Sequence, residues 1–309
     1  MEPPEYAPIA LLFITSLLAL PSPISSQVCQ RYCSNIRLKY PFGAGAGCGH
    51  PRFQNSVTCS SQKQLIFTTH TGCYPITEID YSNEIIYISD PTMSTCFCMQ
   101  PSKGFGLDCD APFSFHDSTI FALLGCSAAS SPIYRTNGGA NINGGNSTRY
   151  VPQCDNESTP FCSSLYSCQP ISQLYTPIST CCVYTPVDLG PSFEMDLREL
   201  KCFSYTAVYS FSGREDDPGS WKYGVALQYK FNVGNDYPSF CAACESSNGV
   251  CGYSGEADSF ICNCPSGENT TTDCYFQTSW NHGFGLLPWS KGTWLINIAV
   301  ELLLVWFMH

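Results

Sequence analysis

The sequence lacks the motifs of the common enzyme classes. It has no G-x-S-x-G nucleophile elbow, no H-E-x-x-H zinc-protease motif, and none of the glycine-rich loop, V-A-I-K, H-R-D and D-F-G motifs of protein kinases. The acidic run at residues 215–217 lies beside glycine and proline, which is typical of an exposed loop rather than of paired glycosidase carboxylates. These absences argue against a catalytic protein and favour a binding protein.

A second C-x-x-C pair is also missing. A zinc–thiolate site usually has two such pairs, and here only Cys241 and Cys244 have that spacing. Cysteine itself is abundant, with 21 residues between Cys29 and Cys274. Cysteine at this density is used for disulfides in an oxidising compartment, so we expect a secreted or cell-surface protein without a metal site or other cofactor.

Both ends of the chain have the composition of targeting segments. Residues 9–20 form a short apolar run that ends at Pro21, which predicts a signal peptide over residues 1–26. Residues 282–309 end in an apolar stretch that is short for a membrane span. We interpret this tail as a signal for a glycolipid (GPI) anchor attached at Asn281 or Gly283, with a transmembrane or retained tail as alternatives.

The remaining chain divides by composition. A cysteine-rich region at residues 27–127 is followed by a Ser-, Asn- and Gly-rich stretch at 128–150, which predicts a linker. A second cysteine-rich region then covers residues 151–274. Three N-x-S/T sequons, at Asn146, Asn156 and Asn269, predict N-glycosylation in the secretory pathway.

The predicted fold class is mainly β, in small disulfide-rich domains. Short apolar runs rich in β-branched and aromatic residues, bounded by Gly, Pro, Asn or Ser, predict strands at 36–40, 64–69, 76–81, 84–89, 119–124, 203–212 and 222–233. A turn at residues 81–84 would join two of them as a hairpin. The single helix we predict covers residues 193–201, where Phe193, Leu197 and Leu200 share one face.

The last six cysteines, at residues 241–274, form the most specific local pattern. Their spacing, with a C-x-C between the fourth and the fifth, resembles an EGF-like module. That resemblance implies the pairs Cys241–Cys251, Cys244–Cys262 and Cys264–Cys274. The acidic residues of calcium-binding EGF modules are not found just before Cys241, so we do not expect calcium binding.

The N-terminal region carries a wider family resemblance. The stretches C-Q-R-Y-C at 29–33, Y-P-F-G at 40–43 and G-C-G-H-P at 47–51 resemble the galacturonan-binding domain of plant wall-associated receptor kinases. Residues 223–229 and 241–264 resemble the C-terminal cysteine-rich domain that follows it in those receptors. The resemblance implies an extracellular, non-catalytic protein at the plasma membrane or cell wall that binds pectic galacturonan.

The charge distribution agrees with an anionic ligand. The whole chain has a net charge of −11, yet residues 27–77 contain no acid and all of the following cations: Arg31, Arg37, Lys39, Arg52 and Lys63. We predict that these five residues bind uronate carboxylates and that Tyr40 contributes an aromatic face. Tyr32, Phe42 and Phe53 are interleaved with them.

Structural roles for the same residues remain open. Tyr40 and its neighbours in Y-P-F-G can instead fill a small core. Arg37 and Lys39 alternate with Leu38 and Tyr40, so they can also be the solvated face of a strand. His50 is expected to be a loop residue. The alternative function is an ectodomain that binds a receptor kinase, another cell-surface protein or a peptide; nothing indicates nucleic-acid binding.

An odd number of cysteines leaves at least one unpaired in a monomer. Our candidate is Cys109, because Asp108 and Asp110 flank it and negative neighbours disfavour the reactive thiolate.

Overall fold

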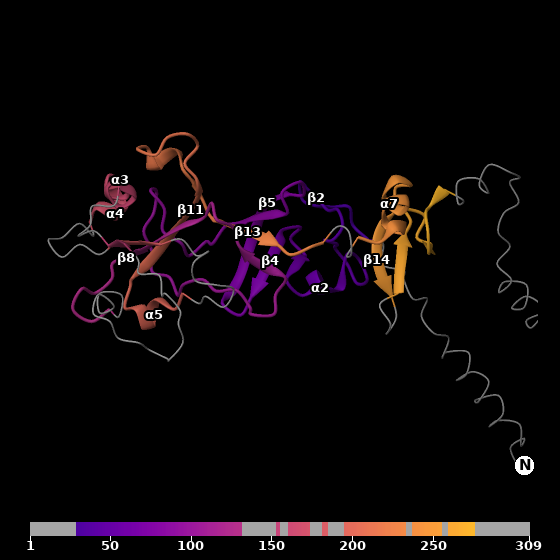
Figure 1. Cartoon of the computed structure of the whole chain (residues 1–309), viewed down its shortest axis with the longest axis horizontal. Coiled ribbons are helices and arrows are strands. Elements are labelled where there is room, and N and C mark those ends of the chain that lie inside the picture. The colour runs from indigo at the N-terminus through magenta and orange to yellow at the C-terminus, as the bar shows by residue number, and fades with distance from the viewer. Residues whose placement is uncertain are drawn as a thin grey trace, which may run out of the picture.

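The computed structural model describes residues 29–131, 153–154, 160–173, 181–184, 195–232, 237–254 and 259–275. These residues form an elongated molecule of three parts in a row (Figure 1). Several predicted features lie outside the described residues: the signal peptide, the C-terminal tail with Asn281 and Gly283, the sequons at Asn146 and Asn156, and most of the linker. Within the described part, no helix has both the length and the apolar character needed to cross a membrane.

The middle part is a six-stranded antiparallel sheet (Figure 1). Its strands, in spatial order, are β3 (Val57–Cys59), β4 (Leu65–Thr69), β5 (Gly72–Asp80), β6 (Ile85–Ile88), β13 (Val225–Tyr229) and β7 (Phe113–Phe115). In β4, buried and half-buried residues alternate, as expected for a strand with one face on the core. A small sheet of β1 (Tyr32–Cys33) and β2 (Ile36–Arg37), and the one-turn helix α2 (Pro51–Gln54), adjoin it.

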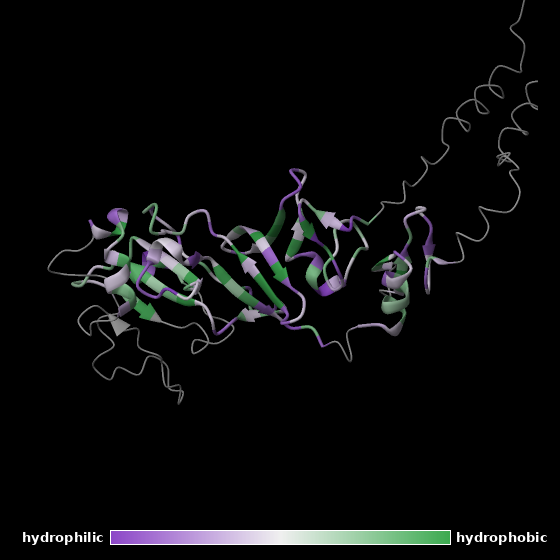
Figure 2. Cartoon of the chain, turned by 90° about the horizontal axis from the view of Figure 1, so that it is seen from above, coloured by the Kyte–Doolittle hydropathy of each residue, from purple (hydrophilic) through white to green (hydrophobic). Residues whose placement is uncertain are grey.

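Aromatic rings fill the core of the middle part. Phe53 packs edge-on against Phe42, Phe113 and Tyr229, with ring centroids 5.4, 5.6 and 6.1 Å away. Figure 2 shows hydrophobic residues along the strands and hydrophilic residues in the turns that connect them. Such edge-to-face contacts add roughly 0.5–1.5 kcal/mol each to the free energy of burial.

A second sheet of five strands forms one end of the molecule (Figure 1). Its order is β12 (Lys222–Tyr223), β11 (Ser204–Ser210), β8 (Ile120–Leu124), β10 (Cys182–Tyr184) and β9 (Gln153–Cys154). The helices α3 (Pro160–Tyr166) and α4 (Gln169–Ser172), the one-turn helix α5 (Leu197–Leu200) and the 3-10 turn η4 (Pro218–Ser220) belong to this end. A cluster around Trp221, Val208 and Leu165 forms its core.

The other end is the EGF-like module. It consists of the helix α7 (Ser239–Ser246) and a three-stranded sheet of β14 (Val250–Ser254), β15 (Ser259–Asn263) and β16 (Asn269–Thr270). Its disulfides are Cys241–Cys251, Cys244–Cys262 and Cys264–Cys274, which are the pairs that the EGF resemblance implies. Asn269, the one sequon in the described residues, is exposed.

The predicted fold class is confirmed, and the differences in detail have local causes. The predicted strand at 36–40 pairs only as far as Arg37, because the chain turns there: the Phe42 amide donates to the Lys39 carbonyl at 2.9 Å. The predicted helix at 193–201 contains α5, which ends where Lys201 adopts a left-handed φ of 55°. Helix α7 was missed, because Cys241 and Cys244, its buried residues, were interpreted only as members of a cysteine pattern.

The described strands do not separate at the predicted linker. Strand β13, from the second half, lies between β6 and β7 of the first half, and β8 lies between β11 and β10. Two disulfides, Cys96–Cys168 and Cys126–Cys202, also join the two halves. Composition marks a polar segment, but it carries no information on which distant strands pair across that segment.

Cysteine pairing follows this interlaced topology. The N-terminal disulfides are Cys29–Cys48 and Cys33–Cys59, and Cys162 pairs with Cys181. Cys109 has a free, exposed thiol, as predicted. Cys73 and Cys98 are also free and exposed, and nothing in their spacing distinguished them from paired cysteines.

Candidate ligand-binding site

A groove of about 410 Å³ lies between the N-terminal β1–β2 hairpin and helix α7. The hairpin supplies the cations, because Tyr32 pairs with Arg37 and the Leu38 amide donates to the Arg31 carbonyl at 2.8 Å. In this register Arg37 lies opposite Tyr32 and Leu38 lies opposite Arg31, so the two arginines are diagonal neighbours on the hairpin. Arg31, Arg37 and Lys39 all line the groove. Three of the five predicted cations therefore converge on one site.

Each of these cations keeps a charged group available to a ligand. Arg37 is exposed, and its side chain makes no ion pair or hydrogen bond within the described residues. Lys39 is exposed, with its Nζ 5.6 Å from the centre of the Tyr81 ring. Arg31 is half-buried and donates from Nη1 to Oδ1 of Asn248, at 3.3 Å. Weak neutral contacts of this kind hold the side chains in place without neutralising them.

Tyr81 fixes the backbone under the cations. Its hydroxyl donates to the Arg37 carbonyl at 3.0 Å and accepts the Lys39 amide at 2.9 Å. Burial raises the pKa of Tyr81, so the hydroxyl remains a donor over the physiological range. Tyr81 follows directly after β5, so the central sheet positions the backbone of Arg37 and Lys39.

Glu245 of α7 places one carboxylate among the cations. Its Oε1 accepts the Tyr40 amide at 3.2 Å, and its Oε2 accepts the Tyr237 hydroxyl at 3.1 Å. Burial, and then the neighbouring Glu245 carboxylate, raise the pKa of Tyr237 to about 12. Sequence reasoning missed Glu245, because no acid lies within residues 27–77 and nothing local indicates that α7 packs on them.

Tyr40 lines the groove, but its ring is buried. It packs edge-on against Phe231 and Tyr237, and its hydroxyl lies 2.9 Å from that of Tyr253. The structural alternative for Y-P-F-G therefore applies to its side chain. Phe42 and Phe53 are also buried and cannot stack on a ligand. Tyr32, with 55% of its surface exposed, is the most exposed aromatic side chain of the groove.

The G-C-G-H-P stretch joins the hairpin region to the EGF-like module. The Gly49 amide donates to the Cys251 carbonyl at 2.8 Å, and the Tyr253 amide donates to the Gly47 carbonyl at 2.9 Å. A Cβ atom on Gly252 would overlap the Gly47 carbonyl oxygen, so the two backbones need glycine where they meet. His50, as expected for a loop residue, caps α2 through its Nδ1, which accepts the Arg52 amide.

The remaining predicted residues lie outside the groove. Arg52 is exposed on α2, and Lys63 is exposed in the turn between β3 and β4 with a φ of 58°. Neither lines the groove. The predicted ligand set is thus divided by the fold: Arg31, Arg37, Lys39 and Tyr40 lie at the groove, and Arg52 and Lys63 lie elsewhere on the surface.

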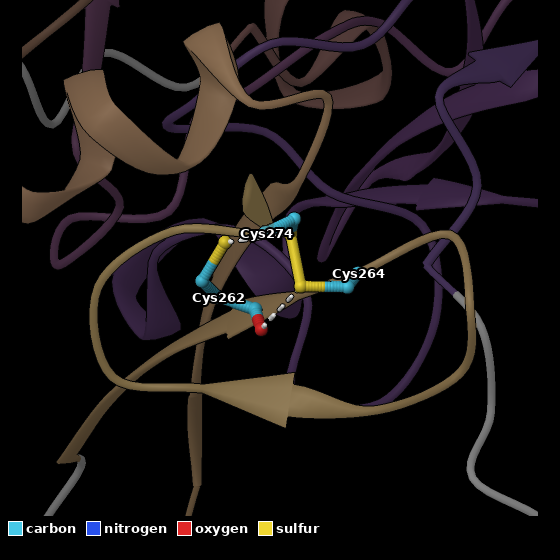
Figure 3. Close-up of side chains that lie close together, drawn as sticks. All are labelled: Cys262, Cys264 and Cys274. Atoms are coloured by element: carbon cyan, nitrogen blue, oxygen red, sulfur yellow. Dashed lines mark hydrogen bonds between the residues drawn. A yellow bond between two sulfur atoms is a disulfide. The ribbon is translucent and has the colours of Figure 1, made fainter. Parts of the chain in front are cut away.

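One cluster of potential metal ligands consists of cysteines that are bonded in disulfides. Cys262, Cys264 and Cys274 lie together in the EGF-like module (Figure 3). Cys264 is bonded to Cys274, and Cys262 is bonded to Cys244. The 3.5 Å contact between the Cys262 and Cys274 sulfurs joins two disulfides. These sulfurs act as a staple for a module too small to be stable on its hydrophobic core alone.

Comparison with known proteins finds two matched segments in the chain. Residues 29–90 match the family described as wall-associated receptor kinase galacturonan-binding, and residues 197–267 match wall-associated receptor kinase C-terminal. No solved structure matches the chain. The groove is lined by residues of both matched segments.

Two receptor kinases of Arabidopsis thaliana are similar to parts of the chain. Wall-associated receptor kinase 3 is 27% identical over 106 residues, which are 33% of this chain and 14% of that protein. Wall-associated receptor kinase 2 is 25% identical over 161 residues, which are 48% of this chain and 20% of that protein. The chain thus spans a fifth or less of the length of these relatives. It carries the wall-associated receptor kinase galacturonan-binding domain, followed by the wall-associated receptor kinase C-terminal domain.

Proposed function

We propose that this protein is a non-catalytic extracellular binding protein for pectic galacturonan, and that the groove between the hairpin and α7 is its binding site. The observation that carries the proposal is the convergence of Arg31, Arg37 and Lys39 beside the exposed ring of Tyr32. The family description of residues 29–90 and the disulfides support the same ligand and the same compartment.

Each group in the groove suits one part of a galacturonate unit. A guanidinium group can hold a carboxylate through two parallel hydrogen bonds, which suits Arg37 for the uronate carboxylate. The Tyr32 ring offers a flat apolar face to the C–H side of the sugar. Lys39 adds a compact positive charge that attracts the carboxylate of the same or the next unit.

Glu245 would accept hydrogen bonds from the hydroxyl groups of the sugar. A carboxylate has about four lone-pair positions, and the Tyr40 amide and the Tyr237 hydroxyl use two of them. The remaining positions can accept sugar hydroxyls. Because Glu245 is fixed by these bonds, its charge also repels a uronate carboxylate that approaches from the α7 side. The ligand is therefore oriented with its carboxylate toward the hairpin.

The test is titration of the full chain with de-esterified oligogalacturonides at several salt concentrations. We expect binding to weaken from low to physiological salt, because exposed charges are screened. The double variant Arg37→Ala/Lys39→Ala should bind at least about tenfold more weakly, which corresponds to about 1.4 kcal/mol. Fully methyl-esterified oligomers, which lack the carboxylate charge, should bind weakly to both proteins.

The matched control is Lys222→Ala/Lys230→Ala. It removes the same amount of positive charge as the double variant in the groove. Both lysines are exposed, and neither lines the groove. Equal losses in both double variants would mean that only the overall charge matters, and the groove would be rejected as the site. Absence of oligogalacturonide binding at low salt would reject the function and favour an ectodomain that binds protein partners.

A further inference from the structure

A second, larger cavity of about 550 Å³ lies at the opposite end of β5. One wall is formed by the first residues of β5, including Cys73 and Tyr74, and another by the loop from Asp90 to Gly104. Arg198 of α5 completes it. The volume lies within the range of small-molecule sites. Like the groove, this cavity combines residues from both matched segments, since Asp90 ends the first and Arg198 belongs to the second.

Backbone pairing brings two cations to this cavity. The Leu197 amide donates to the Lys103 carbonyl at 3.1 Å, and the Met195 amide donates to the Phe105 carbonyl at 3.0 Å. The two segments approach closely at Gly104, where any Cβ atom would overlap the Met195 carbonyl oxygen. Lys103 and Arg198, 95 positions apart in the sequence, therefore line the same cavity.

The charge that this cavity offers to a ligand is positive. Lys103 and Arg198 are exposed, and within the described residues neither side chain makes an ion pair or a hydrogen bond. Asp90 is only 4% exposed. Its carboxylate accepts the Tyr205 hydroxyl and, at 2.7 and 2.8 Å, the amide and hydroxyl of Thr92. The one carboxylate of the cavity is thus used internally, and the two cations are not.

The remaining lining suits a polyhydroxylated ligand. Thr92 and Ser102 contribute hydroxyl oxygens, each with a lone pair left beside its contacts to Asp90, Gly104 and one another, and these can accept from sugar hydroxyls. Pro91 and Pro101 are exposed and form rigid apolar surfaces at the same cavity. A small anion without hydroxyl groups would use only part of this lining.

We propose that this cavity is a second binding site for a carboxylate-bearing sugar unit, and that one acidic polysaccharide chain occupies both sites. The second part rests on the function proposed for the groove. Strand β5 connects the sites: Tyr74 lines the cavity, and Tyr81, just after the strand, supports Arg37 and Lys39. Seven residues of extended strand separate them by roughly 23 Å.

Two sites at this separation predict a dependence on ligand length. An oligomer that cannot span β5 occupies one site at a time and binds with the affinity of a single site. An oligomer that spans it converts the second contact into an intramolecular step, which can strengthen binding on the order of 10²-fold. Affinity should therefore rise in a step as the oligomer lengthens, rather than in proportion to the number of units.

The cavity can be tested directly through its own thiol. Cys73 is free, exposed and part of the lining, whereas Cys98 and Cys109 are free and exposed but do not line it. We would alkylate the full-length protein with iodoacetamide, with and without galacturonic acid monomer, and follow each thiol by peptide mass spectrometry. We expect galacturonic acid to slow modification of Cys73 at least threefold and to leave Cys98 and Cys109 unchanged.

Neutral galactose and the variant Lys103→Ala/Arg198→Ala are the controls. Protection of Cys73 should be absent with galactose and lost in the variant. Equal protection by galactose, equal protection of Cys98, or full protection in the variant would each overturn the second site. This measurement does not involve the groove, so it separates failure of the cavity from failure of the proposed function.

Oligomers of increasing length test whether one polysaccharide chain occupies the groove and the cavity together. De-esterified oligogalacturonides, from the disaccharide to long oligomers, are titrated against the natural protein and the Lys103→Ala/Arg198→Ala variant. The variant should keep its affinity for short oligomers at the groove and lose the step for long ones. An unchanged step in the variant would overturn occupancy of both sites by one chain, even if Cys73 protection is observed.

Discussion

The two ends of the central sheet are joined to their neighbours in different ways. Toward the five-stranded sheet the connection includes a disulfide, because Cys96, in the loop after β6, is bonded to Cys168 just before α4. Cys126–Cys202 lies within that end and links the paired strands β8 and β11. Toward the EGF-like module, every described disulfide is internal to one side. The contact there is made by hydrogen bonds, at Gly47 and Gly49 and to Asn248 and Glu245, and by aromatic packing around Tyr40. One junction is stapled, and the other depends on close fit.

This difference separates the two cavities physically. The groove lies at the junction that depends on fit, so a single substitution there can separate the hairpin cations from Glu245. The second cavity lies toward the stapled junction, where the loop that forms one of its walls is tied to the start of α4 by Cys96–Cys168. We therefore expect that the protein can lose one site and keep the other.

The largest effect is expected from removal of a long-range staple. Cys126 and Cys202 are 76 residues apart, and closure of a loop of that length is worth about 4.5 kcal/mol by chain entropy. The variant Cys126→Ser/Cys202→Ser should be destabilised by about that amount and secreted poorly. The measurement is the free energy of unfolding in guanidinium chloride, together with the secreted yield.

A short-range disulfide is the matched comparison. Cys241 and Cys251 are 10 residues apart, which corresponds to about 2.7 kcal/mol on the same basis. The variant Cys241→Ser/Cys251→Ser should lose the groove while leaving the rest of the molecule folded. A larger loss of stability here than in the Cys126/Cys202 variant would contradict the dependence on loop length.

An intermediate effect is expected at the close-fitting junction. In Gly252→Ala, the added Cβ meets the Gly47 carbonyl oxygen, and relief of the overlap should cost about 1–3 kcal/mol of docking free energy. Oligogalacturonide binding at the groove should fall at least about tenfold, equivalent to about 1.4 kcal/mol. Protection of Cys73 by galacturonic acid should persist.

Gly219→Ala serves as its control. The nearest atom to a Cβ at Gly219 is the Asp217 Oδ1, 3.3 Å away on an exposed side chain that can move. Stability should change by no more than about 0.5 kcal/mol, and both sites should be retained. Simultaneous loss of groove binding and Cys73 protection in Gly252→Ala would show that the two junctions are not independent.

The smallest effect concerns alkaline pH. The pKa of Tyr237 in the folded protein is raised to about 12 from the ordinary value of 10.0, through burial and the Glu245 charge. The folded state therefore holds this proton more tightly than the unfolded state. Its stabilising contribution is complete below pH 10 and is lost as the pH rises toward 12.

Tyr237→Phe isolates that contribution. With free thiols alkylated beforehand, urea unfolding midpoints are measured across pH 9–12 for both proteins. The variant should show a shallower loss of stability above pH 10, although other buried tyrosines, such as Tyr223, add to the slope in both proteins. Identical slopes would mean that Tyr237 contributes nothing to the docking of the EGF-like module.

Local patterns were the most successful part of sequence reasoning. The alternation around Leu65 and Phe67 predicts β4, and the short turn after Tyr81 predicts the β5–β6 hairpin. The exposure of Arg37 and Lys39 and the burial of Leu38 also follow from alternation. These features depend on neighbours within a few residues, so the sequence contains them directly.

The sequence by itself determined the β-rich, disulfide-stapled class, the family resemblance and the cationic character of residues 27–77. It did not determine which cations share a site. Arg31 and Arg37 line one groove from the two arms of a hairpin, and Glu245 lines the same groove from α7. Lys103 and Arg198, 95 positions apart, line one cavity. Only the tertiary structure decided this, because strand pairing and module docking depend on the packing of whole surfaces rather than on local spacing.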